Sequence, residues 1–446
     1  MKLRQLHKIN FLKRTERSLS DAHEVFRGAS AALFIRGLGA TLSFLFNLVI
    51  AQLLGAAGTG LFFLALSFTV IGSLFSRVGL DNILLRLVAH AYAANDGNRA
   101  KAVVRAGLSI AAVSSPLIAA SGFLLATQIA IHVYDKPELA VSLRWASLAI
   151  IATTFQILLS QVLRGARSIV YSSLVAAALH PALGLLLIWP SIYFLGDSGA
   201  IAAYFFSTAL AALSGCYIWR LMRGPKSLEL EKQFRWRELV PGAKALFLMS
   251  LIQNWMIPWA PVSALGILYS SQETGVFAAA TRVSSLLAFF LTSVNIAIAP
   301  KFAELHKLKQ TERLKRLSRQ FSLFSFFATL PFLVLLILYS EEIMHLFGSE
   351  FRSGAMTLSI LSIGHMVNIA TGSVGFILIM GGREDVARNT SVLSAVILLI
   401  LLGILVPIWG ATGAALASVA AISFANIINS FSVWRFFGFI VYPSYK

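Results

Sequence analysis

Long apolar runs alternate with short polar connections along almost the whole chain. Each run is close to or above the roughly 20 residues that an α-helix needs to cross the hydrocarbon core of a membrane. Short segments of alternating polarity, which would indicate membrane β-strands, do not occur. The pattern predicts an all-α polytopic membrane protein with twelve transmembrane helices, at residues 29–54, 58–78, 103–132, 141–163, 169–193, 199–220, 242–268, 274–299, 319–340, 354–380, 389–408 and 411–434.

The basic residues lie mainly on one side of this predicted bundle. The net charge is +18, but Lys and Arg occupy short connections rather than a continuous patch, so we exclude nucleic acid as the partner. Of the 37 Lys and Arg residues, 32 fall in the N-terminal tail, the alternate connections and the C-terminus. Only Lys136, Arg144 and Arg352 fall on the other side. By the positive-inside rule, both termini are cytoplasmic, and we expect a multi-pass protein of the cell inner (plasma) membrane.

A weak internal repeat divides the chain into two halves. LLGAAGTGLFFLA (53–65) aligns with LYSSQETGVFAAA (268–280), and LGDSGAIAA (195–203) aligns with WGATGAALA (409–417) at nearly the same offset. Both halves begin on the cytoplasmic side, so they are parallel six-helix repeats around a central cavity. We therefore expect an N-terminal lobe at 1–222, a cytoplasmic linker at 223–241 and a C-terminal lobe at 242–446. The stretch 79–102 is a candidate amphipathic helix at the membrane surface.

Motifs that would indicate an enzyme are missing from the sequence. There is no catalytic triad, no nucleotide-binding glycine loop and no group of residues with metal-ligand spacing. The lone cysteine, Cys216, excludes an intrachain disulfide. We expect a transporter without a cofactor, which leaves its substrate to be inferred from polar residues inside the membrane.

A polar stripe interrupts the first apolar run. Arg36, Ser43 and Asn47 lie within about 40 degrees of one another around a helix. Such stripes face other helices or a water-filled cavity rather than lipid. Arg36 therefore either lines a cavity or extends its charge to the nearby inner membrane surface.

Arg282 is the second charge inside an apolar run. It lies well past Glu273, roughly 13 Å into the membrane from the outer side. An unpaired arginine at this depth costs roughly 2.5–3.5 kcal/mol, and a structural partner would have to be a carboxylate. No Asp or Glu lies inside any predicted helix. We therefore expect Arg282 to face a cavity and bind an anion, beside a polar stripe that includes Asn295.

The seventh predicted helix contains QNWMIPWAP at residues 253–261. Pro258 and Pro261 lack backbone donors, so the helix should kink there, and the bend could gate a cavity. The two tryptophans are four residues apart and share a face, for packing or for stacking on sugar rings. The candidate substrate-binding residues around the kink are Gln253, Asn254, Trp255 and Trp259.

NLVIAQLLGAAGTGLFFLALSF followed by RVGLDNILLRLVAHAYA resembles the polysaccharide-lipid flippases, of the O-antigen type, in the multidrug/oligosaccharidyl-lipid/polysaccharide exporter superfamily. The resemblance extends over the whole chain in helix number and repeat. It implies that the protein moves a polyprenyl-diphosphate-linked glycan from the cytoplasmic to the outer leaflet by alternating access. It further implies a cavity lined by Arg36 and Arg282, with a glycan polymerase and glycosyltransferases as further partners. Gln52 departs from the family, which often has a basic residue there.

Other functions agree less well with the sequence. A major-facilitator transporter also has six plus six helices, but its basic loop motif is missing between the second and third predicted helices. A drug-type exporter of the same superfamily would call for carboxylates within the membrane, which the predicted helices lack. A membrane glycan polymerase or glycosyltransferase would need a large external loop, and the longest here spans only about 341–353. A passive scramblase would move its substrate freely in both directions without an energy source.

Overall fold

The computed structural model of the protein describes residues 2–222, 243–308 and 310–441; the side chains of 2–29, 243–246 and most of 290–307 are outside the description. All regular elements within these ranges are helices. Seven helical stretches among them are long and apolar enough to cross a membrane. The prediction of an all-α membrane protein is thus confirmed at the level of helix type and apolar length.

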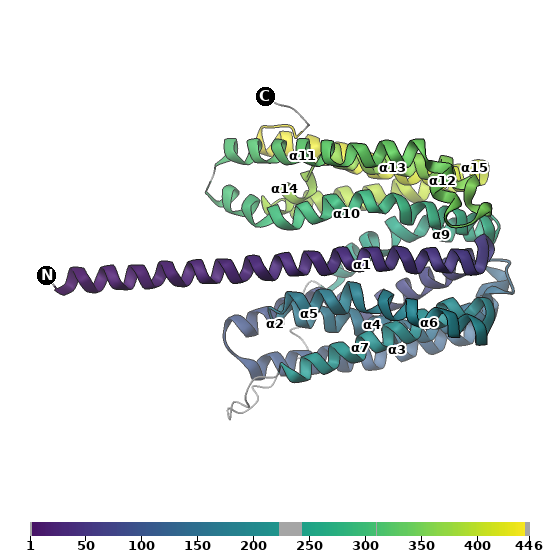
Figure 1. Ribbon diagram of the computed structural model, residues 1–446, viewed down its shortest axis with the longest axis horizontal. Coiled ribbons are helices and arrows are strands. Elements are labelled where there is room, and N and C mark those ends of the chain that lie inside the picture. Colours follow the sequence, from purple (N-terminus) through teal and green to yellow (C-terminus); the bar gives the residue numbers. More distant parts are fainter. Residues whose placement is uncertain (1, 223–242, 309, 442–446) are drawn as a thin grey trace.

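The helices of residues 2–222 are called the N-terminal group. In Figure 1, α1 runs through the middle of the molecule and the other helices of this group lie below it. The group consists of α1 (Lys2–Arg77), α2 (Leu80–Ala93), α3 (Gly97–His132), α4 (Leu139–Gly165), α5 (Ile169–Ser173), the π-helix η1 (Leu174–Ala178), α6 (Leu179–Leu195), the 3₁₀-helix η2 (Gly196–Ser198) and α7 (Gly199–Leu221).

The helices of residues 243–441 are called the C-terminal group, and most of them lie above α1 in Figure 1. The predicted linker between the groups, 223–241, lies outside the described residues. The group consists of α8 (Ala243–Leu251), the π-helix η4 (Ile252–Met256), α9 (Ile257–Leu268), α10 (Ser271–Lys307), α11 (Thr311–Leu338), α12 (Ser340–His345), the 3₁₀-helix η5 (Ser349–Gly354), α13 (Ala355–Ala370), α14 (Val374–Met380) and α15 (Glu384–Phe437).

Glycines break the two longest helices at the positions where the sequence predicts a connection. Gly55 in α1 has φ 65° and ψ −172°, and Gly410 in α15 has φ 51° and ψ −128°. L-residues rarely adopt a positive φ, so glycine is the residue that these turns require. The break at Gly55 contacts η5, which packs on α12, and we call this end of the molecule the Gly55 end. Figure 1 shows α12 and α2 at opposite ends of the molecule.

The two halves share local geometry at positions that the predicted repeat aligns. Gly196 and Gly410 both have a positive φ, 59° and 51°. Three residues after each, a side chain on Gly199 or Gly413 would collide with a carbonyl oxygen of the preceding helix. Glycine at these positions therefore allows two consecutive helices to approach closely in each half.

One predicted helix is interrupted in the structure. The sequence predicts a continuous helix over 354–380, but α13 ends at Ala370 and α14 begins at Val374. Gly372, between them, has φ 69°, which is incompatible with a right-handed helix. The prediction of one continuous helix is wrong because it rested on hydrophobicity, and the apolar pattern continues through this turn.

Within the stretch 79–102, the structure has a short amphipathic helix, α2, at Leu80–Ala93, and α3 already begins at Gly97. The location of α2 at the membrane surface stays a prediction. One face of α2 is buried against α3 and α4 through Leu80, Ile83, Leu84 and Val88.

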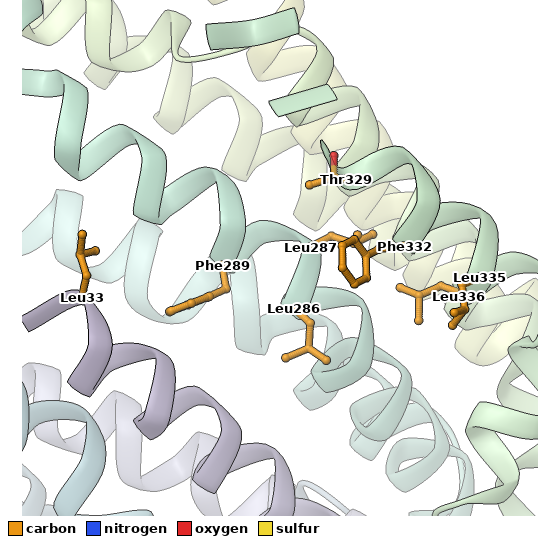
Figure 2. Close-up of a pocket in the computed structure, with 8 residues that line it drawn as sticks. All are labelled: Leu33, Leu286, Leu287, Phe289, Thr329, Phe332, Leu335 and Leu336. Carbon is orange, nitrogen blue, oxygen red and sulfur yellow. The ribbon is translucent and has the colours of Figure 1, made fainter. Parts of the chain in front are cut away.

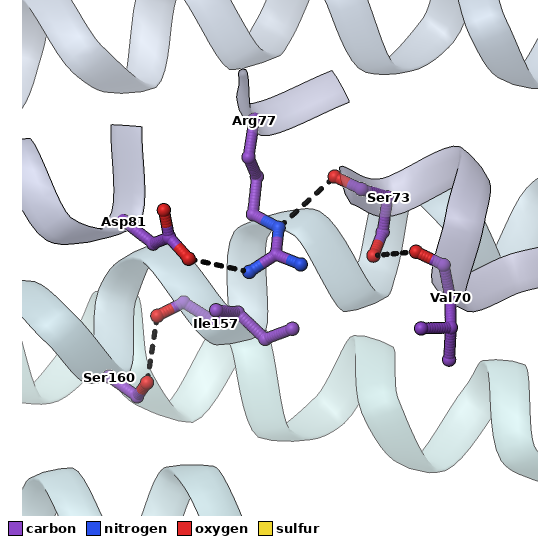
Figure 3. Close-up of polar contacts among 6 residues, drawn as sticks. All are labelled: Val70, Ser73, Arg77, Asp81, Ile157 and Ser160. Atoms are coloured by element: carbon purple, nitrogen blue, oxygen red, sulfur yellow. Dashed lines mark hydrogen bonds and ion pairs between the residues drawn. The ribbon is translucent and has the colours of Figure 1, made fainter. Parts of the chain in front are cut away.

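Figure 3 shows the ion pair that joins α1 to α2: Arg77 Nη1 lies 3.2 Å from Asp81 Oδ2, and both side chains are almost fully buried. Arg77 Nε also donates to the Ser73 carbonyl at 3.1 Å. The pair fixes the direction in which the chain leaves α1, around the left-handed Gly79.

Candidate functional site

A cavity of about 350 Å³ lies between α1 and α10, and we call it the polar cavity because four polar side chains contribute to its otherwise apolar lining. Ser43 and Asn47 reach it from one helix, and Arg282 and Ser285 reach it from the other. The predicted polar stripe of α1 and the predicted cavity arginine therefore line one site, although they are far apart in the sequence. The full lining is Ala40, Ser43, Phe44, Asn47, Arg282, Ser285, Leu286, Ala288 and Phe289.

Arg282 lies against two aromatic rings. Its guanidinium carbon is 5.1 Å from the ring centroid of Phe63 in α1 and 4.8 Å from that of Trp259 in α9. No carboxylate forms an ion pair with Arg282 among the described residues. The expectation that only a carboxylate could serve as its partner is wrong, because the electron-rich faces of aromatic rings also attract a cation. Among the described residues, no side-chain hydrogen bond from Arg282 accompanies these ring contacts, and its guanidinium carries five N–H donors.

Arg36 does not line the polar cavity. It is half-buried, and the charge of Arg164 near the end of α4 lies close enough to repel it. Arg36 thus lies outside the cavity lining and within electrostatic range of a second cation. Its role in binding stays a prediction, as does the alternative that it extends to the membrane surface.

The kink predicted around Pro258 and Pro261 coincides with a local change of helix type. Residues Ile252–Met256 form the π-helix η4, directly before α9, which has Pro258 near its start. A proline at this point removes a backbone donor, and the wider π turn accommodates the lost hydrogen bond. Whether this bend gates the cavity stays a prediction.

The polar and aromatic residues of this kink separate onto two sides. Gln253 and Asn254 are exposed and do not line the polar cavity. The Nε1–H of Trp255 donates to Ser67 Oγ at 3.2 Å, and Trp259 packs at 6.4 Å from the Phe63 ring. Both tryptophans thus contact the second half of α1, on one face as expected, and Trp259 is buried. Asn295 lies in α10, but its side chain is outside the described residues.

A second, apolar cavity of about 540 Å³ lies beside the polar one. Figure 2 shows the residues that line it. The two cavities share Leu286 and Phe289 of α10, so their walls are continuous. The apolar cavity adds Leu33 of α1 and a row of α11 residues: Thr329, Phe332, Leu335 and Leu336. Sequence reasoning missed this cavity and the contact of Phe63 with Arg282, because apolar side chains on a membrane helix give no signal that separates a cavity from lipid.

Residues 25–306 match the family model described as polysaccharide biosynthesis protein. A curated relative from Haloferax volcanii is named "Probable low-salt glycan biosynthesis flippase Agl15" and is 26% identical over 234 residues. That match covers 52% of this chain and 49% of the relative, so it spans about half the length of each.

Two solved structures have the same fold over almost the whole chain. The lipid II flippase MurJ, in an inward closed conformation, gives a TM-score of 0.72 at 14% identity, covering 92% of this chain and 87% of that one. A multidrug resistance MATE family transporter of the MOP superfamily, in an inward-facing conformation, gives 0.71 at 16% identity, covering 92% and 98%. At these identities the likeness concerns the fold alone.

Proposed function

Since the chain belongs to the polysaccharide biosynthesis protein family, we propose that it is a flippase for a polyprenyl-diphosphate-linked oligosaccharide. It moves this substrate from the cytoplasmic to the outer leaflet for surface polysaccharide export. The name of the Haloferax volcanii relative and the fold shared with MurJ support this function. These relatives are flippases and transporters rather than enzymes.

The observation that carries the proposal is the pairing of two unlike cavities. One is polar and contains an arginine, and the other is apolar, yet they share a wall at Leu286 and Phe289. A substrate with an anionic head and a hydrocarbon tail matches both: the head enters the polar cavity, while the tail lies along Leu33, Phe332 and Leu335. A small hydrophilic solute would leave the apolar cavity unused.

The polar cavity favours an anion over the cationic drugs that a drug-type exporter of the same superfamily would carry. Arg282 is its charged lining residue, and no Asp or Glu lines either cavity. Arginine donates hydrogen bonds in a planar fork that fits phosphate oxygens. Ser43, Asn47 and Ser285 add hydroxyl and amide groups suited to sugar hydroxyls.

The proposed flippase has a two-lobed arrangement of membrane-spanning helices. Twelve crossings form two parallel six-helix repeats, as lobes at 1–222 and 242–446 joined by a cytoplasmic linker at 223–241, with both termini cytoplasmic. The matched glycine geometry at Gly196 and Gly410 supports the repeat. Transport follows from alternating opening of the two lobes around the central cavity, with the bend at Pro258 and Pro261 as a gating element.

The test uses purified protein in vesicles and two fluorescent substrates with the same glycan and polyprenyl chain. One carries the diphosphate, and the other carries a neutral linker in its place. We expect the diphosphate compound to cross about tenfold faster or more, since charge-assisted hydrogen bonds contribute roughly 1.5–3 kcal/mol. Equal rates for the two compounds, or transport of an organic cation instead, would contradict the proposal.

A further inference from the structure

Several side-chain hydrogen bonds join the two groups of helices at the Gly55 end. Lys136, in the turn between α3 and α4, is buried and reaches across to the end of α9 in the C-terminal group. Its Nζ donates to the carbonyl oxygens of Gly266 at 2.6 Å, Tyr269 at 2.8 Å and, within its own turn, Tyr134 at 3.1 Å. The last carbonyls of a helix have no intrahelical donors, so Lys136 caps α9 and also complements its dipole.

Glu350 makes the reverse contact, from the C-terminal group to the N-terminal group. Its Oε2 accepts a hydrogen bond from the backbone N–H of Ala56 at 2.9 Å, directly after the break at Gly55. This N–H belongs to the first turn of the helix that follows the break, where donors have no intrahelical acceptor. A Cβ at Gly55 would lie 3.2 Å from the Glu350 carboxylate, so the glycine also gives the carboxylate room.

The two caps are reciprocal. A cation from the N-terminal group closes a helix C-terminus in the C-terminal group, and an anion from the C-terminal group closes a helix N-terminus in the N-terminal group. Both charges match the sign that each helix end attracts. Gln52 adds a third bond across the same boundary, from Nε2 to the Leu346 carbonyl at 2.9 Å.

The backbones beneath these caps are in close contact. A side chain on Gly60 would collide with the carbonyl of Ser271, and one on Gly275 would collide with the carbonyl of Ala56. The predicted repeat aligns Gly60 with Gly275, so the halves meet here through equivalent residues. The Gly55 end is therefore closed by backbone packing, and the charged caps secure it.

We propose that Lys136 and Glu350 form a latch that holds the two groups together at the Gly55 end and must release when that end opens. The inference rests on the alternating-access part of the proposed function. The charge distribution of the sequence assigns the Gly55 end to the outer face, so release of the latch is the step that exposes the cavity to the outside.

Burial lowers the pKa of Lys136, while the negative charges of Glu138 and Asp135 act in the opposite direction. The two acids belong to the same turn and move with the lysine. When the groups separate, Lys136 keeps these charges beside it but loses the carbonyls of Gly266 and Tyr269. Only the contacts across the boundary therefore have to be replaced by water during opening.

The structure supplies a matched control for each charge. Glu273 accepts a hydrogen bond from the Ala411 N–H at 2.8 Å, directly after the break at Gly410, but both residues belong to the C-terminal group. Arg144 donates to Thr127 Oγ1 at 3.3 Å within the N-terminal group. Changing either control residue removes a charge near the same end of the molecule without removing a bond between the groups.

The test measures the separation of the groups directly. Spin labels are placed on the exposed positions His132→Cys and Ser353→Cys in a Cys216→Ser background, and distances are recorded by double electron–electron resonance in nanodiscs without substrate. We expect Lys136→Met and Glu350→Gln each to raise the long-distance population about tenfold or more, since losing one charge-assisted hydrogen bond has this size and Lys136 makes two across the boundary. Arg144→Met and Glu273→Gln should leave the distribution unchanged.

An unchanged distribution in both latch variants, or an equal shift in the controls, overturns the latch. Gln52→Ala, at an exposed position, gives a smaller shift in the same direction and serves if the buried lysine variant does not fold. Because no substrate is present, a shift confined to the latch variants supports the latch even where glycan transport fails. The vesicle assay above tests the proposed function separately.

Discussion

Arg282 of α10 lies over the ring of Phe63 in α1, with 5.1 Å between the guanidinium carbon and the ring centroid. One cation therefore both lines the polar cavity and joins the two groups of helices. Trp259 holds the same guanidinium at 4.8 Å from within the C-terminal group. Any movement that separates the two groups at Phe63 must therefore also alter the environment of Arg282.

Replacing Arg282 should reduce transport more than it reduces protein abundance. Arg282→Ala removes the charge-assisted hydrogen bonding to the diphosphate, and the loss of a single such bond, worth roughly 1.5–3 kcal/mol, is enough to lower export roughly ten- to hundredfold or more. Arg282→Lys keeps the charge but loses the planar fork and should retain part of the activity. The measurement is surface glycan in a strain that lacks the native protein, normalised to protein in the membrane. Wild-type export by Arg282→Ala would show that the arginine is structural, and Arg144→Ala is the exposed control.

The aromatic contact should appear as an energetic coupling between Phe63 and Arg282. A cation–π pair contributes about 0.5–2 kcal/mol, so a double-mutant cycle with Phe63→Leu and Arg282→Met should give a coupling of that size. The readout is the free energy of unfolding of the purified protein in detergent. Phe63→Leu combined with Arg144→Met should be additive, because no contact joins that pair. Additivity in the Arg282 cycle would refute the coupling.

Filling the apolar cavity should slow transport of a substrate with a long hydrocarbon tail. Leu33→Trp places a larger ring in the lining, and we expect transport of the full-length polyprenyl substrate to fall about fivefold or more, since overpacking costs about 1–3 kcal/mol. A short-chain analogue should be transported at nearly the wild-type rate. The matched control is Phe34→Trp, at the neighbouring position, whose side chain is 74% exposed and does not line the cavity. Equal slowing of both substrates would argue against a tail site.

Topology tags provide a check that does not depend on the substrate. Tags at residues 230 and 310 should report a cytoplasmic location, and a tag near residue 345 should report an external one. The basis is the distribution of Lys and Arg, with 32 of 37 on one side of the predicted bundle. An external signal from residue 230 would be incompatible with two parallel repeats.

Apolar run length and glycine position predict much of the helical architecture. The predicted connections near Gly55 and Gly410 coincide with the two breaks in α1 and α15, because a positive φ favours glycine and both runs are too long for one crossing. The turn at Gly372 was missed because the apolar pattern passes through it unchanged. Periodicity detects which residues avoid water, but it contains no information about where a buried backbone turns.

In the candidate site, too, some features could be predicted from the sequence and others could not. The helical stripe of Ser43 and Asn47 could be predicted because spacing fixes a helical face, and Arg282 was conspicuous as a charge inside an apolar run. The partners of charged residues could not be predicted. Lys136 binds backbone carbonyls and Arg282 contacts rings, and neither kind of partner leaves a complementary charge in the sequence.

The hydrogen bond from Ala56 to Glu350 also bears on how the protein is made. The two residues are separated by 294 positions, so the helix after Gly55 is synthesised long before the carboxylate that caps it. At about 5–20 residues per second, the interval is roughly 15–60 seconds of translation. Throughout that time the newly inserted N-terminal helices carry a first turn whose cap does not yet exist. The hydrogen bonds at the boundary between the two halves therefore depend on the order of biosynthesis, because the first half completes its hydrogen bonding only after the second half has been synthesised.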